Sequence, residues 1–410
     1  MTTLDDPPVR PPRPWSGRRG RRAPWADALQ RTLQRPLTPY YLLLAASSLL
    51  MVIGLVMVLS ASSVYAYRVT GDSYTVVRRQ LMWAAIAVVG VLVVSRIPMR
   101  VVRMLTWLAL PVVAVLLGLT QTGLGREVGG NTNWLALGPV QIQPSELAKL
   151  TIVLWAADVY ARKEKMLGNV RHMLVPVVFP VVAGMIGLVL WQRDLGTALV
   201  FFAIAFALLW VVGFPVRFFA VALSVVGVAL LVLTWTSAER MRRITNFANP
   251  FEDFHDAGWQ PAHGLFALSS GGVLGQGIGA SQQKWGDLPE AHTDFIFAVL
   301  GEELGLVGTV LVLGLFLTIA VAGVRLATST EDPFVRYASF GIVVWLLGQA
   351  MINVGMVLTL LPVIGIPLPL VSYGGSALVP SLVALGLLIL FARREPAAAA
   401  ALAARRRVPR

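Results

Sequence analysis

The sequence contains no cysteine and little charge. Only 13% of its 410 residues are Asp, Glu, Lys or Arg, about half the share typical of soluble domains. Without cysteine the chain can form no disulfide, no thiolate metal site and no thiol nucleophile. The low charge, with 56% hydrophobic residues and a mean hydropathy of +0.72, excludes an ordinary soluble globular protein. These absences indicate an integral membrane protein.

Apolar runs with few charges recur at about the 20-residue length that a helix needs to cross the hydrocarbon core. They lie near 40–63, 80–95, 104–120, 145–161, 173–191, 197–214, 217–236, 297–324, 337–361 and 374–392. The runs predict an all-α, polytopic integral membrane protein of about ten transmembrane helices. A proline-rich segment, LPVIGIPLPLVSYGG, separates the last two.

The positions of Lys and Arg predict the orientation, because these residues are retained on the cytoplasmic side. With the N-terminus inside, the inner segments hold most of them, so we expect both termini in the cytoplasm. Residues 1–38 are expected to be a disordered basic tail, 39–393 the transmembrane domain and 394–410 a second basic tail. The net charge of +13 is divided among tails and loops, which favours contact with anionic lipid over nucleic acid.

Polar and glycine residues gather in four predicted outer segments. The longest, an extracellular loop at about 237–294 between the seventh and eighth spans, contains GGVLGQGIG and LPEAHTDF. The others contain NTNWLALGPVQIQPSELAK, QRDLGT and LPLVSYGGSAL. Long ordered loops are usually functional, so these segments predict one site at the outer membrane surface.

Three features of these segments bear on chemistry. Asp294 stands where the long loop enters the eighth span, and two interpretations are open: a functional interfacial carboxylate or an N-cap. Glu146 and Lys149 lie three residues apart, so they share a helix face and can form a salt bridge. GGVLGQGIG lacks the spacing of a dinucleotide loop, and we interpret it mainly as flexible or interfacial backbone.

The motifs QPSELAK, RDLGTA, NPFED, LPEAHTDFIFAVLGEELG and LPLVSYGGS resemble the SEDS family in order and spacing. The resemblance covers nearly all ten spans and is greater to the cell-division members than to the elongation members. It implies a peptidoglycan glycosyltransferase that polymerises lipid II into glycan strands on the outer face of the cytoplasmic membrane and releases undecaprenyl diphosphate. It also implies a class B penicillin-binding protein of the FtsI type and other division proteins as partners, at the septum.

The resemblance also implies roles for single residues. Asp294 would be the general base, and Lys149 would pair with it across helices and lower its pKa. Substrate contacts are expected from seven further residues: Glu146, Trp134, Glu290, His292, Arg243, Lys284 and Ser372. No cofactor is certain, but Glu290 is a candidate ligand for a divalent cation such as Mg²⁺ or Mn²⁺.

Several of these residues have alternative interpretations. Arg243 would either neutralise a diphosphate or anchor the seventh span at the lipid headgroups, and Trp134 fits either a sugar platform or an interfacial anchor. Of Glu302 and Glu303, at least one is expected to face the bundle interior.

One departure from the family concerns Arg193, which stands where most members have Pro before the aspartate corresponding to Asp194. If Asp194 is a structural carboxylate, replacement of Arg193 by Pro is expected to be tolerated. Two other functions remain in view. An elongation-type polymerase would share the chemistry, whereas a lipid II flippase would need a charged central cavity and broken helices.

Overall fold

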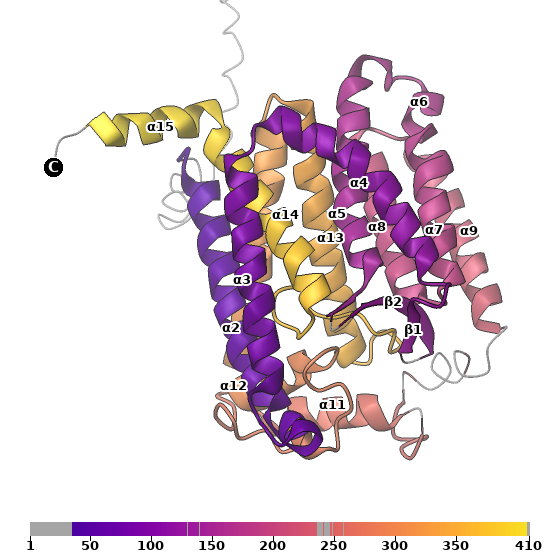
Figure 1. The fold of residues 1–410 in the computed structure, drawn as a ribbon, viewed down its shortest axis with the longest axis vertical. Coiled ribbons are helices and arrows are strands. Elements are labelled where there is room, and N and C mark those ends of the chain that lie inside the picture. Colours follow the sequence, from indigo (N-terminus) through magenta and orange to yellow (C-terminus); the bar gives the residue numbers. More distant parts are fainter. Residues whose placement is uncertain are drawn as a thin grey trace, which may run out of the picture.

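The computed structural model describes residues 35–128, 130–138, 140–235, 241, 247, 249–256 and 258–407. It shows a bundle of long helices with a small sheet and short helices at one end (Figure 1). The helices are α2 (Thr38–Thr70), α3 (Thr75–Arg96), α4 (Met99–Leu119), α5 (Pro144–Arg162), α6 (Val170–Leu174), α7 (Ala183–Trp191), α8 (Leu195–Val211), α9 (Val216–Trp235), α11 (Trp259–Ser270), α12 (Ile296–Ser329), α13 (Pro333–Val357), α14 (Gly375–Arg394) and α15 (Pro396–Arg407). The predicted N-terminal tail falls almost wholly outside the described residues.

The fold is the polytopic helical membrane fold that the apolar runs predict. Among the described residues, seven helical segments are long and apolar enough to cross a membrane, and α8 and part of α9 are shorter apolar helices. The α5 helix also coincides with a predicted span, although it carries several charges. The figure of ten spans stays a prediction.

The most deeply buried helices lie in the centre of the bundle. The α5 helix packs against α4, α8, α13 and α14, and it is buried along almost its whole length. Its charged Asp158 is fully buried at the end opposite the sheet, where Arg103 Nε and Trp107 Nε1 donate to it at 2.5 and 2.8 Å. Buried charge of this kind is tolerated only when it is paired.

A three-stranded antiparallel sheet, which the sequence did not predict, connects α4 to α5. Its strands are β1 (Gly125–Val128), β2 (Asn131–Leu137) and β3 (Val140–Ile142), in the order β1-β2-β3. The long predicted loop is also partly helical, because it contains α11 and a one-turn helix at Gln283–Trp285.

The α12 helix is broken near its start. Gly305 has non-helical φ and ψ angles of 66° and −163°, and the glycine-rich segment 271–279 packs against this break. Backbone amides of Gln276 and Gly277 donate to the carbonyls of Glu302 and Glu303 at 2.9 and 3.0 Å. The segment is therefore ordered backbone packed against α12, and its place at the membrane interface stays a prediction.

Candidate functional site

One end of the bundle gathers the predicted outer segments. The chain enters α5, α8, α12 and α14 at this end, where the sheet and α11 also lie (Figure 1). Hydrogen bonds connect the segments: Tyr373 N donates to His292 O at 2.9 Å, and Ser372 Oγ donates to Thr293 O at 2.6 Å. The LPEAHTDF and LPLVSYGGS motifs, about 80 residues apart in sequence, are thus neighbours in space.

Asp294 lies in the loop just before α12 and does not cap it. The N-cap position is Phe295, and no side chain accepts a hydrogen bond from the first turn. Within the part of the chain that the structure describes, the Asp294 carboxylate accepts no hydrogen bond and forms no ion pair. The capping interpretation is therefore wrong, and the half-buried carboxylate has both oxygens available for a ligand.

The environment of Asp294 disfavours its charge. Burial raises the pKa of Asp294 to about 7, and the negative charges of Glu290 and Asp194 act in the same direction. At neutral pH the carboxyl group is therefore divided between its protonated and ionised forms. Such a pKa suits a general base, because catalysis is most efficient when the pKa lies near the working pH.

Lys149 does not contact Asp294, contrary to the pairing that the family resemblance implies. Its ammonium group is buried and donates to Glu146 Oε1 at 2.6 Å and to Gln349 Oε1 at 3.0 Å. The salt bridge within α5 is therefore the interpretation that the structure supports. The expectation that Lys149 lowers the pKa of Asp294 is wrong in this structure, because the pKa is raised.

Two amides on α13, which the sequence analysis missed, connect these groups. Gln349 accepts from Lys149 and donates to Pro367 O at 3.1 Å. Asn353, one turn further along, donates to Asp294 O at 2.8 Å and to Ile366 O at 2.7 Å. Their spacing of four residues in an otherwise apolar helix was the available signal, because polar groups buried in a membrane helix need partners.

His292 and Glu290 lie beside Asp294 in different environments. The His292 ring stacks on Tyr65 of α2 with centroids 4.9 Å apart and contacts the Tyr373 ring at 5.7 Å. Burial lowers the pKa of His292, while the charge of Glu290 acts in the opposite direction. Glu290 is exposed and accepts from Thr293 Oγ1 at 2.5 Å. The aromatic stack joins α2 to the loop that precedes α12.

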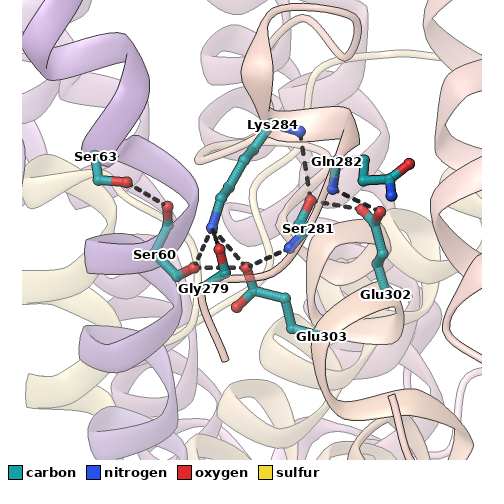
Figure 2. A network of polar contacts seen from close by, with 8 residues as sticks. All are labelled: Ser60, Ser63, Gly279, Ser281, Gln282, Lys284, Glu302 and Glu303. Atoms are coloured by element: carbon teal, nitrogen blue, oxygen red, sulfur yellow. Dashed lines mark hydrogen bonds and ion pairs between the residues drawn. The ribbon is translucent and has the colours of Figure 1, made fainter. Parts of the chain in front are cut away.

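Lys284 belongs to a buried polar network rather than to an open surface (Figure 2). Its ammonium donates to Ser60 Oγ at 2.9 Å, Gly279 O at 2.6 Å and Glu303 Oε1 at 2.9 Å. Glu302 accepts from Ser281 Oγ at 2.5 Å. The network joins α2, the loop and α12, and it confirms that Glu302 and Glu303 face the interior. The substrate contact expected of Lys284 stays a prediction.

A groove of about 770 Å³ opens beside this network, between α2 and the loop. Its walls are mostly apolar, with Val64, Tyr67 and Ile278, and its cations are Arg68 and Lys284. Tyr65, next in sequence to Val64, carries the stack with His292. A mostly apolar groove with a cationic rim suits an amphipathic anionic ligand.

The remaining predicted site residues have different outcomes. Trp134 is half-buried in β2, and its neighbour Asn133 donates to Asp194 Oδ2 at 2.7 Å. Ser372 holds the backbone of two segments together, since its hydroxyl donates to Thr293 O and also accepts from Leu368 N at 2.8 Å. Arg243 lies outside the described residues.

No cluster of three or more metal-ligating side chains occurs in the described parts of the chain. The divalent cation at Glu290 stays a prediction.

The turn before α8 contradicts one expectation about Arg193. Asp194 is the structural carboxylate expected, because it caps α8 by accepting from Thr197 N at 2.9 Å. Arg193, however, has a φ angle of +63°, whereas proline is restricted to about −65°. The expected tolerance of Arg193→Pro is therefore wrong for this backbone.

Comparison with known proteins gives one consistent result. A family model for cell cycle proteins, named for FtsW, RodA and SpoVE, matches residues 40–396. A Mycobacterium tuberculosis protein named a probable peptidoglycan glycosyltransferase FtsW is 38% identical over 375 residues, which cover 91% of this chain and 71% of that protein. Stage V sporulation protein E of Bacillus subtilis is 36% identical over 360 residues, covering 87% and 97% of the two chains.

Solved structures share the fold. The rod shape determining protein RodA of Thermus thermophilus superposes with a TM-score of 0.63 at 27% identity, covering 86% of this chain and 96% of that one. A chain from a structure described as the coordination of polymerization and crosslinking by a peptidoglycan synthase complex has a TM-score of 0.68 at 28% identity, with coverages of 86% and 96%.

Proposed function

The chain belongs to the FtsW/RodA/SpoVE family of cell cycle proteins and is a peptidoglycan glycosyltransferase, and we propose that Asp294 is its general base. The substrate we assign is lipid II, polymerised at the outer face of the cytoplasmic membrane during cell division. The observation that carries the assignment is the Asp294 carboxylate, which lacks a protein partner in the described structure and has a pKa of about 7.

The proposed reaction is a direct displacement at the anomeric carbon of the donor. Asp294 takes the proton of the acceptor sugar hydroxyl while the oxygen of that hydroxyl forms a bond to the anomeric carbon. The bond from the carbon to the diphosphate breaks, and its electron pair leaves with undecaprenyl diphosphate. The leaving group is already a stable anion, so it needs positive charge nearby rather than a proton donor. Arg68 at the groove supplies charge within the described structure.

The site geometry assigns supporting roles to the neighbouring residues. Asn353 and Ser372 hold the backbone carbonyls of Asp294 and Thr293, and Gln349 joins the Lys149–Glu146 pair to the carbonyl of Pro367. The His292–Tyr65 stack is a surface on which a sugar ring can lie. The apolar groove along α2 suits a polyprenyl chain.

The same observations favour the enzyme over a lipid II flippase. A flippase needs broken helices around a cavity, and α12 does break at Gly305. However, the break is filled by the glycine-rich segment, whose amides satisfy the freed carbonyls of Glu302 and Glu303. We assign the division role over elongation because several relatives at 34–39% identity are named FtsW.

We propose a class B penicillin-binding protein of the FtsI type and further division proteins as partners. The support is the similarity to a chain of a complex in which polymerization and crosslinking are coordinated. Placement of both termini in the cytoplasm follows from the excess of Lys and Arg on the predicted inner segments. Location at the septum follows from the proposed division role.

Replacement of Asp294 by Asn tests the base directly. The variant keeps the shape and should fold, but polymerisation of lipid II by the purified protein with its cognate penicillin-binding protein should fall at least ~10²-fold. Asp287→Asn is the matched control, because Asp287 is an exposed carboxylate of the same loop. Near-normal polymerisation by folded Asp294→Asn protein would falsify the assignment. A lipid-translocation assay on the same samples separates a flippase from a polymerase.

A further inference from the structure

A second groove lies at the opposite end of the bundle from Asp294. It has a volume of about 680 Å³ and forms where α3 and α14 end and α15 begins (Figure 1). Its lining includes Arg96 from α3, Arg393 and Arg394 from the last turn of α14, and Leu402 from α15. The glycosyl transfer proposed above uses none of these residues.

The three guanidinium groups form no ion pair in the described structure, although Glu395 follows Arg394 in the sequence. All three arginines are exposed, and in the described residues none forms an ion pair with a carboxylate. The hydrogen bond found for them runs from Arg394 Nη2 to Ile97 O at 3.2 Å, which leaves the positive charge unneutralised. Three cations around one groove repel each other, and a bound anion relieves that repulsion.

The rest of the lining is apolar. Leu390, Ala399 and Leu402 contribute wall on the α14 and α15 sides. Next to the groove, α3 presents exposed Leu92 and Val93 toward the region that hydrocarbon occupies around a membrane helix. A free phosphate would use only the cationic part, whereas a phospholipid uses both, with its phosphate on the arginines and its chains along α3.

We propose that this groove binds the phosphodiester headgroup of an anionic phospholipid. Membrane-length helices end at the depth of the headgroups, and basic pockets between such helix ends are suited to anionic lipid. The bound lipid would bridge α3 and α14 and stabilise α15 at the membrane surface. The topology proposed above places the lipid in the inner leaflet, but the site itself does not depend on Asp294 or on lipid II.

Native mass spectrometry of the full-length protein in detergent tests the site. We expect dioleoyl phosphatidylglycerol to bind more tightly than dioleoyl phosphatidylcholine. The double variant Arg96→Gln/Arg393→Gln should bind phosphatidylglycerol roughly 30-fold more weakly, which corresponds to about 2 kcal/mol for two charges. The double variant keeps the hydrogen bond from Arg394 to Ile97 O. The side chains of Arg96 and Arg393 are exposed, so their replacement should preserve folding. The affinity of the single variant Arg393→Gln for phosphatidylglycerol should be roughly fivefold lower.

The matched control is Lys165→Gln/Arg171→Gln, which removes two exposed cations from the same end of the bundle outside the groove. It should bind phosphatidylglycerol as the unmodified protein does. The proposal is overturned if both double variants lose affinity equally, if Arg96→Gln/Arg393→Gln binds normally, or if phosphatidylcholine binds as tightly. Displacement of the lipid by millimolar inorganic phosphate would also overturn it, because the ligand would then be a free anion.

Discussion

Among single residues, Asp294 and Asp194 show how the same side chain acquires different roles. Asp194 accepts hydrogen bonds from Asn133, Thr197 N and Thr197 Oγ1, so its charge serves to cap α8. Asp294 accepts none in the described structure, and burial, together with the negative charges of Glu290 and Asp194, raises its pKa to about 7. A carboxylate that is not engaged in structure is available for proton transfer.

The raised pKa of Asp294 predicts a pH dependence. The base acts only when ionised, so polymerisation should rise with pH up to about 7 and level off above it. Glu290→Gln removes a negative neighbour, lowers the pKa of Asp294 and should shift this rise to lower pH. Polymerisation rates measured from pH 5 to 9 check the shift, with Asp287→Asn as control. A rate that is flat across this range would contradict the assignment of Asp294 as base.

The backbone at Arg193 predicts a difference between two substitutions. Glycine adopts a φ angle of +63° readily, so the free energy of unfolding of Arg193→Gly should lie within about 1 kcal/mol of that of the unmodified protein. Arg193→Pro cannot adopt that angle and loses the hydrogen bond from Arg193 N to Leu190 O, so it should lose ~3 kcal/mol or more. Thermal unfolding in detergent measures both. Equal melting temperatures would show that the turn rearranges.

At the scale of elements, the break in α12 and the glycine-rich segment form one unit. The helix gives up its regular hydrogen bonds near Gly305, and amides of the segment replace them. The close approach requires glycine, since a Cβ on Gly275 would lie 2.2 Å from Glu303 O. The Lys284–Glu303 ion pair, at 2.9 Å, then joins this unit to Ser60 of α2.

Two alanine substitutions separate close packing from backbone angle. Gly275 and Gly279 both have positive φ angles, 81° and 89°, but an added Cβ meets backbone only at Gly275. Gly279→Ala should therefore cost ~1–2 kcal/mol from the φ angle alone. Gly275→Ala should cost a further ~1–3 kcal/mol from overpacking and also reduce polymerisation. Equal losses of thermal stability would show that the segment does not depend on contact with α12.

At the scale of the whole molecule, the described chain offers helices and loops rather than a separate soluble domain. The loop that carries Asp294 lies at the end of the bundle where α12 begins, and the second groove lies where α14 ends, at the other end of the bundle (Figure 1). We therefore expect a partner to contact the helices or the loops that connect them.

This architecture predicts that the N-terminal tail is dispensable for assembly. Deletion of residues 1–35 should leave the complex with the penicillin-binding protein intact, because we expect the partner to dock on the helical domain. Co-purification of the two proteins from membranes is the measurement, with comparable expression of both forms as the control. Loss of the complex on deletion would assign the docking surface to the tail.

The sequence alone determined the class of fold and the position of the proposed base. Hydrophobic runs are local, and a run of about 20 apolar residues in a membrane has helix as its stable form because every backbone polar group must be paired internally. The position of Asp294 at a loop–helix junction is local in the same sense. For this reason the membrane-length helices and the segments that connect them could be predicted from residue order.

Only the tertiary structure decided which groups are partners. Lys149 binds Gln349, which lies 200 residues away in sequence, rather than Asp294, and Asn353 holds the Asp294 backbone from another helix. The pKa of Asp294 depends on burial and on Asp194, 100 residues earlier in the chain. The φ angle of Arg193 is likewise set by a turn between packed helices. Electrostatics and packing depend on distances in space, and residue order does not fix these distances until the helices are assembled.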